Sequence, residues 1–197
     1  QPSLIVNAAA WTAVDAAEEH HEAAFRLNAE LPAQLATYAK AQDVPLVHYS
    51  SDYVYPGDGE IPWHEDSPTA PLSVYGASKL AGDEAIQASG AQYLIFRTSW
   101  VYSARGNNFL KTMLRLGRER DALKVVADQI GAPTPARLIA EITMLALQAM
   151  RQGVTASGLY HLAPRGETSW HGFACEIFRL AQAQGEMLAI SPDRVDA

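Results

Sequence analysis

Apolar positions along this chain follow two alternating patterns. Short runs of consecutive apolar residues are typical of strands buried on both faces, and apolar positions three or four residues apart are typical of helices. The runs predict strands at residues 4–6, 45–49, 93–97, 123–126 and 159–162, and the spacing predicts helices at 22–42, 74–88, 109–120, 135–152 and 170–184. Because strands and helices alternate, we expect an α/β fold, a doubly wound parallel sheet with helices on both faces.

The first long helix carries large apolar side chains at spacings that predict one buried face, namely Phe25, Leu27, Leu31, Leu35 and Tyr38. Pro32 lies inside this segment, and because proline cannot donate a helical hydrogen bond we expect it to bend or interrupt the helix. Gly90 follows the next predicted helix and is expected to cap its carboxyl end.

Composition and charge narrow the class of protein. Hydrophobic residues make up 48% of the chain and charged residues 19%, as in ordinary globular domains. No apolar run reaches the roughly 18 residues that a membrane span needs, and the first residues do not resemble a signal peptide, so we expect no membrane partner. The net charge is −7, and no basic cluster is longer than Arg118-Glu119-Arg120, so we expect no nucleic-acid partner.

A single cysteine, Cys175, bears on the compartment. One cysteine cannot form an internal disulfide, which favours a reducing, cytoplasmic location. Its neighbours at 173–178 are mostly apolar, so we expect Cys175 to be a small core residue rather than a nucleophile.

Metal ligands are not evident from residue spacing. His20 and His21 have no Cys or His partners at the spacing of a zinc site. The nearby acidic residues are expected to form a polar helical face, and they are Asp15, Glu18, Glu19 and Glu22. We therefore predict no metal site.

The sharpest chemical motif is Tyr75-Gly-Ala-Ser-Lys79. Four residues apart at the start of a helix, Tyr75 and Lys79 share one face and lie within side-chain reach. A cation beside a phenol lowers its pKa from about 10, which would make Tyr75 a usable proton donor when a carbonyl is reduced to an alcohol. Alone, the motif equally describes a core tyrosine followed by a solvated lysine.

A second motif, Tyr49-Ser-Ser-Asp52, closes a predicted strand upstream of Tyr75. Ligands of such sheets bind beyond the carboxyl ends of the strands, where the Ser51 hydroxyl could donate to a substrate carbonyl. The alternative for Ser51 is a helix or turn cap. We favour the catalytic role because the motif with Tyr75 and Lys79 follows it.

Several motifs in order along the chain resemble those of the dTDP-4-dehydrorhamnose reductases, a family of extended short-chain dehydrogenases/reductases. They occur at 7–15, 48–57, 71–82, 96–102, 106–109 and 128–134. Many are shared with other extended reductases, but the combination of Arg97-Thr-Ser-Trp100 with Gly131-Ala-Pro-Thr134 is more specific. The resemblance covers nearly the whole chain and implies a Rossmann-like sheet with a smaller carboxyl-terminal lobe that binds a nucleotide sugar.

The resemblance also implies roles for individual residues. Tyr75 would donate the proton to the C4 oxygen of a ketosugar, and Ser51 stands where the family usually has threonine. Lys79 would hold the nicotinamide ribose and lower the Tyr75 pKa. The remaining cofactor residues would be Ala8, Ala9, Ala10, Trp11, Thr12 and Tyr49, and the substrate residues would be Ser51, Asp52, Trp100 and Asn108. The implied cofactor is NADPH or NADH, and Mg²⁺ is not excluded.

One family feature does not occur in this sequence. The glycine-rich turn that meets the pyrophosphate at a helix N-terminus is missing, so we expect that the chain lacks the amino-terminal βαβ portion and alone binds NAD(P)H weakly. The rest is expected to form one interleaved unit. Its cofactor part would be mainly 1–125 plus 155–165, and its substrate segments mainly 100–155 and 165–197.

The leading functional hypothesis is reduction of a dTDP-linked 4-keto-6-deoxysugar to dTDP-rhamnose, with a small nucleotide sugar as partner and a possible homodimer. Related 4,6-dehydratases need an Asp-Glu pair after the hydroxyl residue, and this chain has Ser51-Asp-Tyr53. Alternatives are another nucleotide-sugar reductase or epimerase, or a non-catalytic subunit of the kind that partners a methionine adenosyltransferase.

Overall fold

The structure is a computed structural model that describes residues 2–191 and 194–196. By its contacts the chain forms two compact units, each built from two stretches of sequence. The first unit is Gln1–Thr98 with Thr143–Leu162, and the second is Ser99–Ile142 with Ala163–Ala197. The first stretch of the first unit ends at Thr98. The expected division into a cofactor part and substrate segments stays a prediction.

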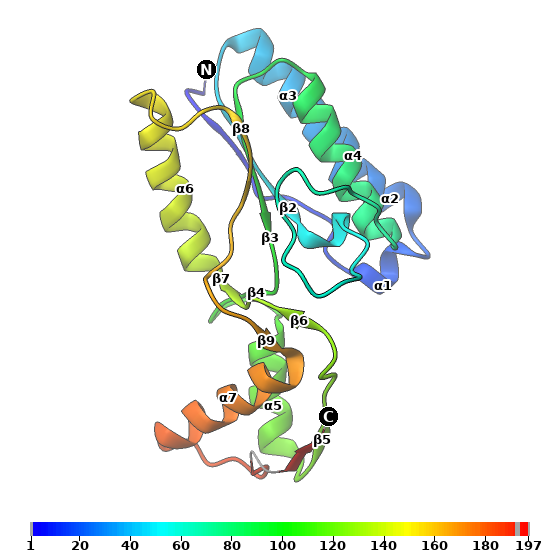
Figure 1. Ribbon diagram of the computed structural model, residues 1–197, viewed down its shortest axis with the longest axis vertical. Coiled ribbons are helices and arrows are strands. Elements are labelled where there is room, and N and C mark those ends of the chain that lie inside the picture. Colours follow the sequence, from blue (N-terminus) through cyan, green and yellow to red (C-terminus); the bar gives the residue numbers. More distant parts are fainter. Residues whose placement is uncertain (1, 192–193, 197) are drawn as a thin grey trace. The chain divides into compact units, whose positions relative to one another are not determined.

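The first unit contains a parallel four-stranded sheet in the order β1-β2-β3-β8 (Figure 1). Its strands are β1 (Ile5–Asn7), β2 (Leu46–Ser51), β3 (Tyr93–Thr98) and β8 (Gly158–His161). The helices α3 (Leu31–Gln42) and α4 (Val74–Ala88) pack on one face of this sheet. The core on that face comprises Ala36, Ala39, Val44, Leu46, Ile86, Ala91 and Ile95. The predicted parallel sheet and four of the five predicted strands are confirmed, whereas the strand expected at 123–126 is a two-residue strand, Leu123–Lys124, that lies outside this sheet.

The first long helical segment buries a different face from the predicted one. It consists of α2 (His21–Phe25), a π-helical stretch η1 (Arg26–Glu30) and α3, preceded by the short α1 (Val14–Ala17). Its buried residues are Ala24, Asn28, Pro32, Ala36 and Ala39, whereas Leu27 and Tyr38 are 38% and 43% exposed. The predicted face is therefore correct only in part: Phe25, Leu31 and Leu35 are half-buried, but the closest approach to α4 is made by small side chains.

The π-helical stretch has a local cause. Pro32 has no N–H to donate to the carbonyl of Asn28, four residues earlier, so that turn widens just before α3 begins. A Cβ on Gly82 of α4 would come 2.1 Å from the Asn28 carbonyl oxygen. The segment is therefore interrupted near Pro32, as predicted, and glycine is required at position 82 for the close approach.

The bounds of α4 follow from its own sequence. The Ser73 hydroxyl accepts a hydrogen bond from the Gly76 N–H at 3.1 Å, and Glu18 accepts one from the Val74 N–H at 2.8 Å. Both contacts satisfy N–H groups that have no partner inside the helix. The helix ends before Gly90, which has a φ of 68°. The predicted helix at 74–88 is confirmed.

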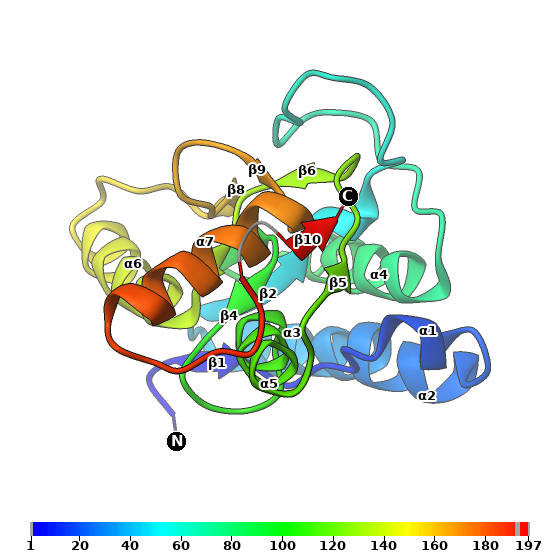
Figure 2. The ribbon, with the colours of Figure 1, turned by 90° about the horizontal axis from the view of Figure 1, so that it is seen from below.

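The second unit packs two helices around its own core. These are α5 (Phe109–Glu119) and α7 (Trp170–Ala183), which lie side by side (Figure 2). Short strand pairs complete it: β4 (Val101–Tyr102) with β7 (Thr134–Pro135), β6 (Ile130–Gly131) with β9 (Thr168–Ser169), and β5 (Leu123–Lys124) with β10 (Val195–Asp196). Cys175 is half-buried and packs against the core of this unit.

The helix α6 (Ala136–Arg151) contains the boundary between the two units. Of the helices in residues 2–191 and 194–196, none is long and apolar enough to cross a membrane.

Candidate active site

The candidate site lies where β2 ends and α4 begins. Ser51 is the last residue of β2, and its hydroxyl accepts a hydrogen bond from the Tyr53 N–H at 3.2 Å and donates one to Asp52 at 3.1 Å. It therefore caps the short 3₁₀ turn η2 (Asp52–Val54), which is the alternative role considered for it. Tyr75, in the first turn of α4, is near enough for the same hydroxyl to act on the pKa of its phenol.

Tyr75 does not have the lowered pKa that the sequence motif suggested. Burial raises the pKa of its phenol to about 12, and the nearby Asp52 carboxylate adds to this, although the hydrogen bond from Ser51 opposes it. The Tyr53 ring packs edge-on against Tyr75, with the ring centroids 5.4 Å apart. The expected lowering of the Tyr75 pKa by Lys79 was therefore wrong, and the phenol stays protonated at neutral pH.

Lys79 is directed toward the sheet rather than toward solvent. Its side chain is 2% exposed, and its ammonium donates a hydrogen bond to the Tyr49 carbonyl at 2.6 Å and lies 3.3 Å from His48 Nε2. Burial lowers the pKa of Lys79 to about 8, although the Asp83 carboxylate opposes this. The interpretation of Lys79 as a solvated surface charge is thus wrong.

The predicted cofactor residues surround the end of β1. Ala8, Ala9 and Thr12 are exposed, and Ala10 and Trp11 are half-buried. Small exposed side chains at the carboxyl end of a parallel strand leave room for a dinucleotide to approach the backbone. Tyr49 contributes its carbonyl to Lys79, while its hydroxyl lies 3.0 Å from the Thr143 hydroxyl on α6.

One residue that sequence reasoning missed connects these parts. Asn28, fully buried in η1, accepts a hydrogen bond from the Trp11 N–H at 2.9 Å and donates to the Trp11 carbonyl at 3.0 Å. Its amide also donates to Ser78, whose hydroxyl donates to the Tyr75 carbonyl at 2.7 Å. Asn28 therefore links the turn after β1 to the first turn of α4. A polar residue four before Pro32, inside an apolar helix, was the available signal.

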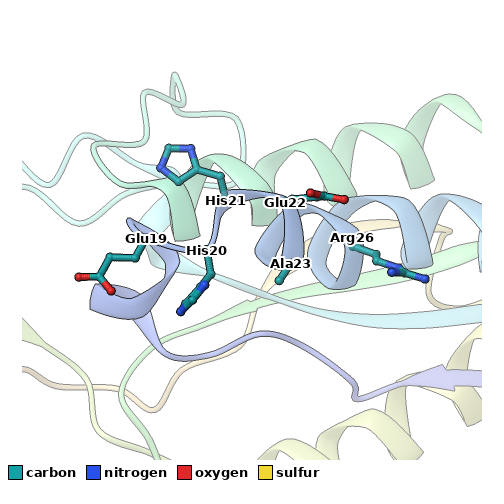
Figure 3. Close-up of a pocket in the computed structure, with 6 residues that line it drawn as sticks. All are labelled: Glu19, His20, His21, Glu22, Ala23 and Arg26. Carbon is teal, nitrogen blue, oxygen red and sulfur yellow. The ribbon is translucent and has the colours of Figure 1, made fainter.

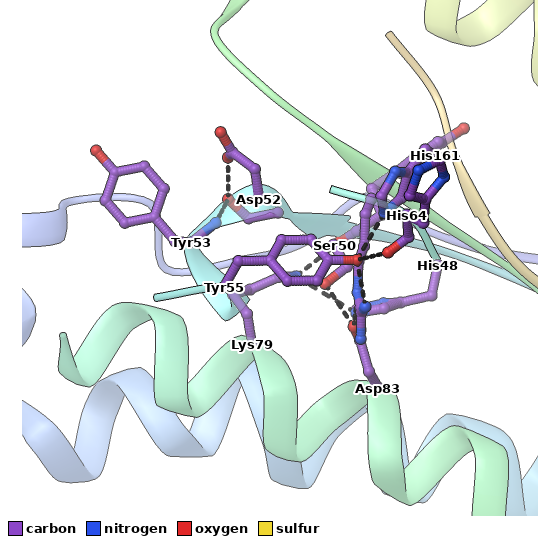
Figure 4. A network of polar contacts seen from close by, with 12 residues as sticks. His48, Ser50, Asp52, Tyr53, Tyr55, His64, Lys79, Asp83 and His161 are labelled. Carbon is purple, nitrogen blue, oxygen red and sulfur yellow. Dashed lines mark hydrogen bonds and ion pairs between the residues drawn. The ribbon is translucent and has the colours of Figure 1, made fainter. Parts of the chain in front are cut away.

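A buried polar network surrounds Asp83, one helical turn after Lys79 (Figure 4). Asp83 accepts hydrogen bonds from Ser50 at 2.8 Å and from the Arg97 guanidinium at 3.1 Å. Arg97 also donates to the Tyr55 hydroxyl at 2.8 Å, and that hydroxyl lies 2.7 Å from His161 Nε2. The network thus runs from α4 across the ends of β2, β3 and β8.

Asp52 has an elevated pKa, which leads to a stability prediction. Burial raises its pKa to about 6, although hydrogen bonds from Ser51 and the backbone lower it. Since the folded-state pKa is raised, the contribution of Asp52 to stability is present at low pH and lost as the pH rises through about 6. We expect the free energy of unfolding of Asp52→Asn to be about 1 kcal/mol higher than that of the natural protein at pH 8. At pH 4 the two free energies should be equal. Urea unfolding at both pH values tests this, and a variant less stable at pH 8 would contradict it.

The two remaining substrate candidates, Trp100 and Asn108, belong to the second unit. Trp100 has a φ of 47°, stacks on Trp170 with centroids 3.6 Å apart, and lies so close to Gly131 that a Cβ there would come 2.6 Å from its ring. Asn108 caps α5 by accepting a hydrogen bond from the Lys111 N–H at 3.2 Å. Its amide donates to the Ser103 carbonyl at 2.8 Å. Their predicted contact with substrate stays a prediction.

A surface pocket lies over α2 and the turn that precedes it (Figure 3). It is lined by Glu19, His20, His21, Glu22, Ala23 and Arg26. None of these residues belongs to the predicted site, so the pocket does not change the assignment above.

Comparison with known proteins identifies the family. The model of the RmlD substrate-binding domain matches residues 1–196. The chain belongs to this family. A dTDP-4-dehydrorhamnose reductase of Salmonella typhimurium is 50% identical over 191 residues, which cover 97% of this chain and 64% of that protein. The chain therefore spans less than two thirds of the length of this relative.

Solved structures agree with this assignment. A dTDP-4-dehydrorhamnose reductase from Clostridium acetobutylicum is 38% identical with a TM-score of 0.86, covering 96% of this chain and 65% of that one. Another from Bacillus anthracis, in complex with NADP, is 39% identical with a TM-score of 0.83. The match covers 92% of this chain and 63% of that one. The predicted family and its Rossmann-like α/β fold are confirmed.

Proposed function

We propose that the protein reduces the C4 keto group of dTDP-4-dehydro-6-deoxy-L-mannose to give dTDP-L-rhamnose, with NADPH or NADH as reductant. The observation that carries the proposal is the placement of Ser51 at the carboxyl end of β2 with Tyr75 in the first turn of α4 near enough for the Ser51 hydroxyl to affect its pKa, and with Lys79 one helical turn further on. The names of the relatives support it, since they are dTDP-4-dehydrorhamnose reductases.

In this proposal Tyr75 is the general acid. When bound, the nicotinamide supplies a hydride to C4 of the sugar. Tyr75 gives its phenolic proton to the C4 oxygen, and Ser51 donates a hydrogen bond to the same oxygen as negative charge develops on it. A pKa of about 12 keeps the proton on Tyr75 until the carbonyl oxygen becomes basic enough to take it. Asp52, Trp100 and Asn108 would contact the substrate.

The residues present fit the nicotinamide end of a dinucleotide. Ala8, Ala9 and Thr12 offer an exposed turn with little side-chain bulk at the end of β1. An ammonium has three N–H donors, and the hydrogen bond of Lys79 to the Tyr49 carbonyl uses one of them. A second donor is thus available for a ribose hydroxyl.

Turnover is the direct test. The intact protein should oxidise NADPH or NADH in the presence of the dTDP-linked 4-ketosugar, and the product should be dTDP-rhamnose by mass spectrometry and NMR. dTDP-glucose, which has no keto group at C4, serves as the matched control. A folded protein that oxidises neither coenzyme would refute the proposal and favour a non-catalytic subunit.

A further prediction concerns the hydroxyl group of Ser51. Ser51→Thr should leave kcat nearly unchanged, because threonine offers the same hydroxyl donor. Ser51→Ala should lower kcat by about 10²-fold with little effect on coenzyme affinity, since the hydrogen bond lost is to the substrate oxygen. Steady-state kinetics of both variants test this, and equal behaviour of the two would mean that Ser51 only caps η2.

A homodimer and a cytoplasmic location complete the proposal. Both rest on the resemblance to the reductase family and, for location, on the single cysteine. Light scattering of the intact protein tests the first, and a monomer at micromolar concentration would contradict it.

A further inference from the structure

Two buried, oppositely charged side chains on one face of α4 do not pair. Lys79 and Asp83 are four residues apart, the spacing at which a lysine and an aspartate usually form an ion pair. Among the residues that the structure describes, Arg97 is the ion-pair partner of Asp83 at 3.1 Å, and His48 Nε2 lies 4.0 Å from Asp83 Oδ1. Lys79 donates instead to the Tyr49 carbonyl at 2.6 Å. A neighbouring group must therefore keep Lys79 from forming the expected ion pair with Asp83.

One of the two carboxylate oxygens of Asp83 is available for a partner. Its Oδ2 atom accepts hydrogen bonds from Ser50 and Arg97, whereas its Oδ1 atom is buried and accepts none within the described part of the chain. An unpaired buried carboxylate oxygen is unfavourable, and in a medium of low dielectric it attracts a nearby ammonium strongly.

The imidazole of His48 stands beside both groups (Figure 4). His48 lies on β2 and is 1% exposed, with Nε2 at 3.3 Å from the Lys79 ammonium and 4.0 Å from Asp83 Oδ1. Its Nε2 atom is therefore close to both charged groups.

The hydrogen bonds of Asn7 set the tautomer of this ring. The Asn7 Oδ1 accepts from the Ala9 N–H at 3.2 Å, so its amide nitrogen is the atom 3.0 Å from His48 Nδ1. That nitrogen donates, and Nδ1 must accept, which leaves the proton of neutral His48 on Nε2. Burial and the charge of Lys79 hold the pKa of His48 well below its usual value, so the ring is neutral. The proton on Nε2 is therefore close to both the Lys79 ammonium and Asp83 Oδ1. Its partial positive charge attracts the carboxylate and repels the ammonium.

We propose that His48 is a positioning residue that keeps the Lys79 ammonium away from Asp83 and directed to the carbonyl of Tyr49, on the strand that ends at Ser51. The proposal rests on the proposed function of Lys79. Without the imidazole, Lys79 pairs with Asp83 and withdraws from the site.

The test combines two positions in the intact protein. His48→Ala should lower kcat by about 10²-fold, as expected for a catalytic group displaced by an ångström or more. His48→Gln, whose amide can place an N–H near the position of Nε2, should retain most of the turnover. In His48→Ala/Asp83→Asn the ammonium has no carboxylate to pair with, so turnover should recover relative to His48→Ala.

This recovery separates positioning from stability. The Asp83→Asn change weakens a buried ion pair with Arg97, so a purely structural role for His48 predicts that the double variant is worse than His48→Ala. Thermal unfolding of each variant should show the double variant as the less stable one, even while its kcat is higher. A double variant with lower kcat than His48→Ala would overturn the proposal.

A second readout does not depend on activity. The pKa of the Lys79 amine, followed by NMR of ¹³C-labelled lysine and assigned with Lys79→Met, should rise in His48→Ala because a carboxylate partner favours the charged amine. It should not rise in the double variant. An unchanged pKa in His48→Ala would refute the positioning role, whereas the expected rise in a protein without turnover would refute only the proposed function.

Discussion

Replacing Tyr75 with phenylalanine is expected to lower kcat by about 10²-fold or more, the usual effect of losing a general acid. The ring and its contact with Tyr53 remain, and the neutral phenol loses only a hydrogen bond with Ser51. Stability should therefore change by no more than about 1 kcal/mol. Steady-state kinetics and urea unfolding of the intact protein measure both quantities.

Tyr93 offers a matched control for this variant. It lies at the opposite, amino-terminal end of β3 and packs against the core. Tyr93→Phe should leave kcat unchanged. If Tyr75→Phe retained near-natural turnover, the assignment of the acid would be wrong, and if both variants lost turnover equally, the effect would not be specific to the site.

Lys79→Met is expected to abolish most of the turnover while it stabilises the fold. Methionine fills a similar volume without a charge. The amine has a pKa of about 8 in the folded protein against 10.5 for the unperturbed group, so burying the charge at pH 7 costs about 3 kcal/mol. Losing the hydrogen bond to the Tyr49 carbonyl offsets about 1 kcal/mol of this gain. The variant should thus be about 2 kcal/mol more stable at pH 7.

The pH dependence of this effect has a definite sign. Because the folded-state pKa of Lys79 is lowered, the natural protein gains stability as the pH rises from about 8 toward 10.5, and Lys79→Met should lack that gain. Turnover of the natural protein should fall above about pH 8 as Lys79 loses its proton. Tyr75, with a pKa of about 12, does not titrate in this range.

Unfolding curves at pH 7 and 9.5 and a pH–rate profile check these expectations together. A Lys79→Met variant that is less stable than the natural protein at pH 7 would contradict the buried-charge argument. A rate that stays flat through pH 8 would mean that the charge of Lys79 is not needed for turnover.

Local signals predicted the elements that carry the site. Gly90 marks the carboxyl end of α4, and the apolar run at 45–49 covers most of β2. These features depend on hydrogen bonds within a few residues, so they can be recognised without knowledge of the rest of the fold.

The errors share one cause, which is contact between distant segments. Leu27 and Tyr38 were predicted to be buried by their spacing, but η1 and α3 approach α4 through small residues such as Ala36 and through Gly82. Asn28 was missed for the same reason, because its partners Trp11 and Ser78 are far away in the sequence. Spacing alone does not tell which face of a helix meets its neighbour.

The sequence by itself determined that Tyr75 and Lys79 share one face of a helix beyond the strand that ends at Ser51, because helix periodicity and strand order follow from local patterns. Only the tertiary structure decided the electrostatics of these groups. Burial raises the pKa of Tyr75 and lowers that of Lys79, and His48 Nε2 lies close to both Lys79 and Asp83. Desolvation and the distance to a charge depend on what packs around a side chain, and those neighbours come from strands and helices that meet only when the chain folds.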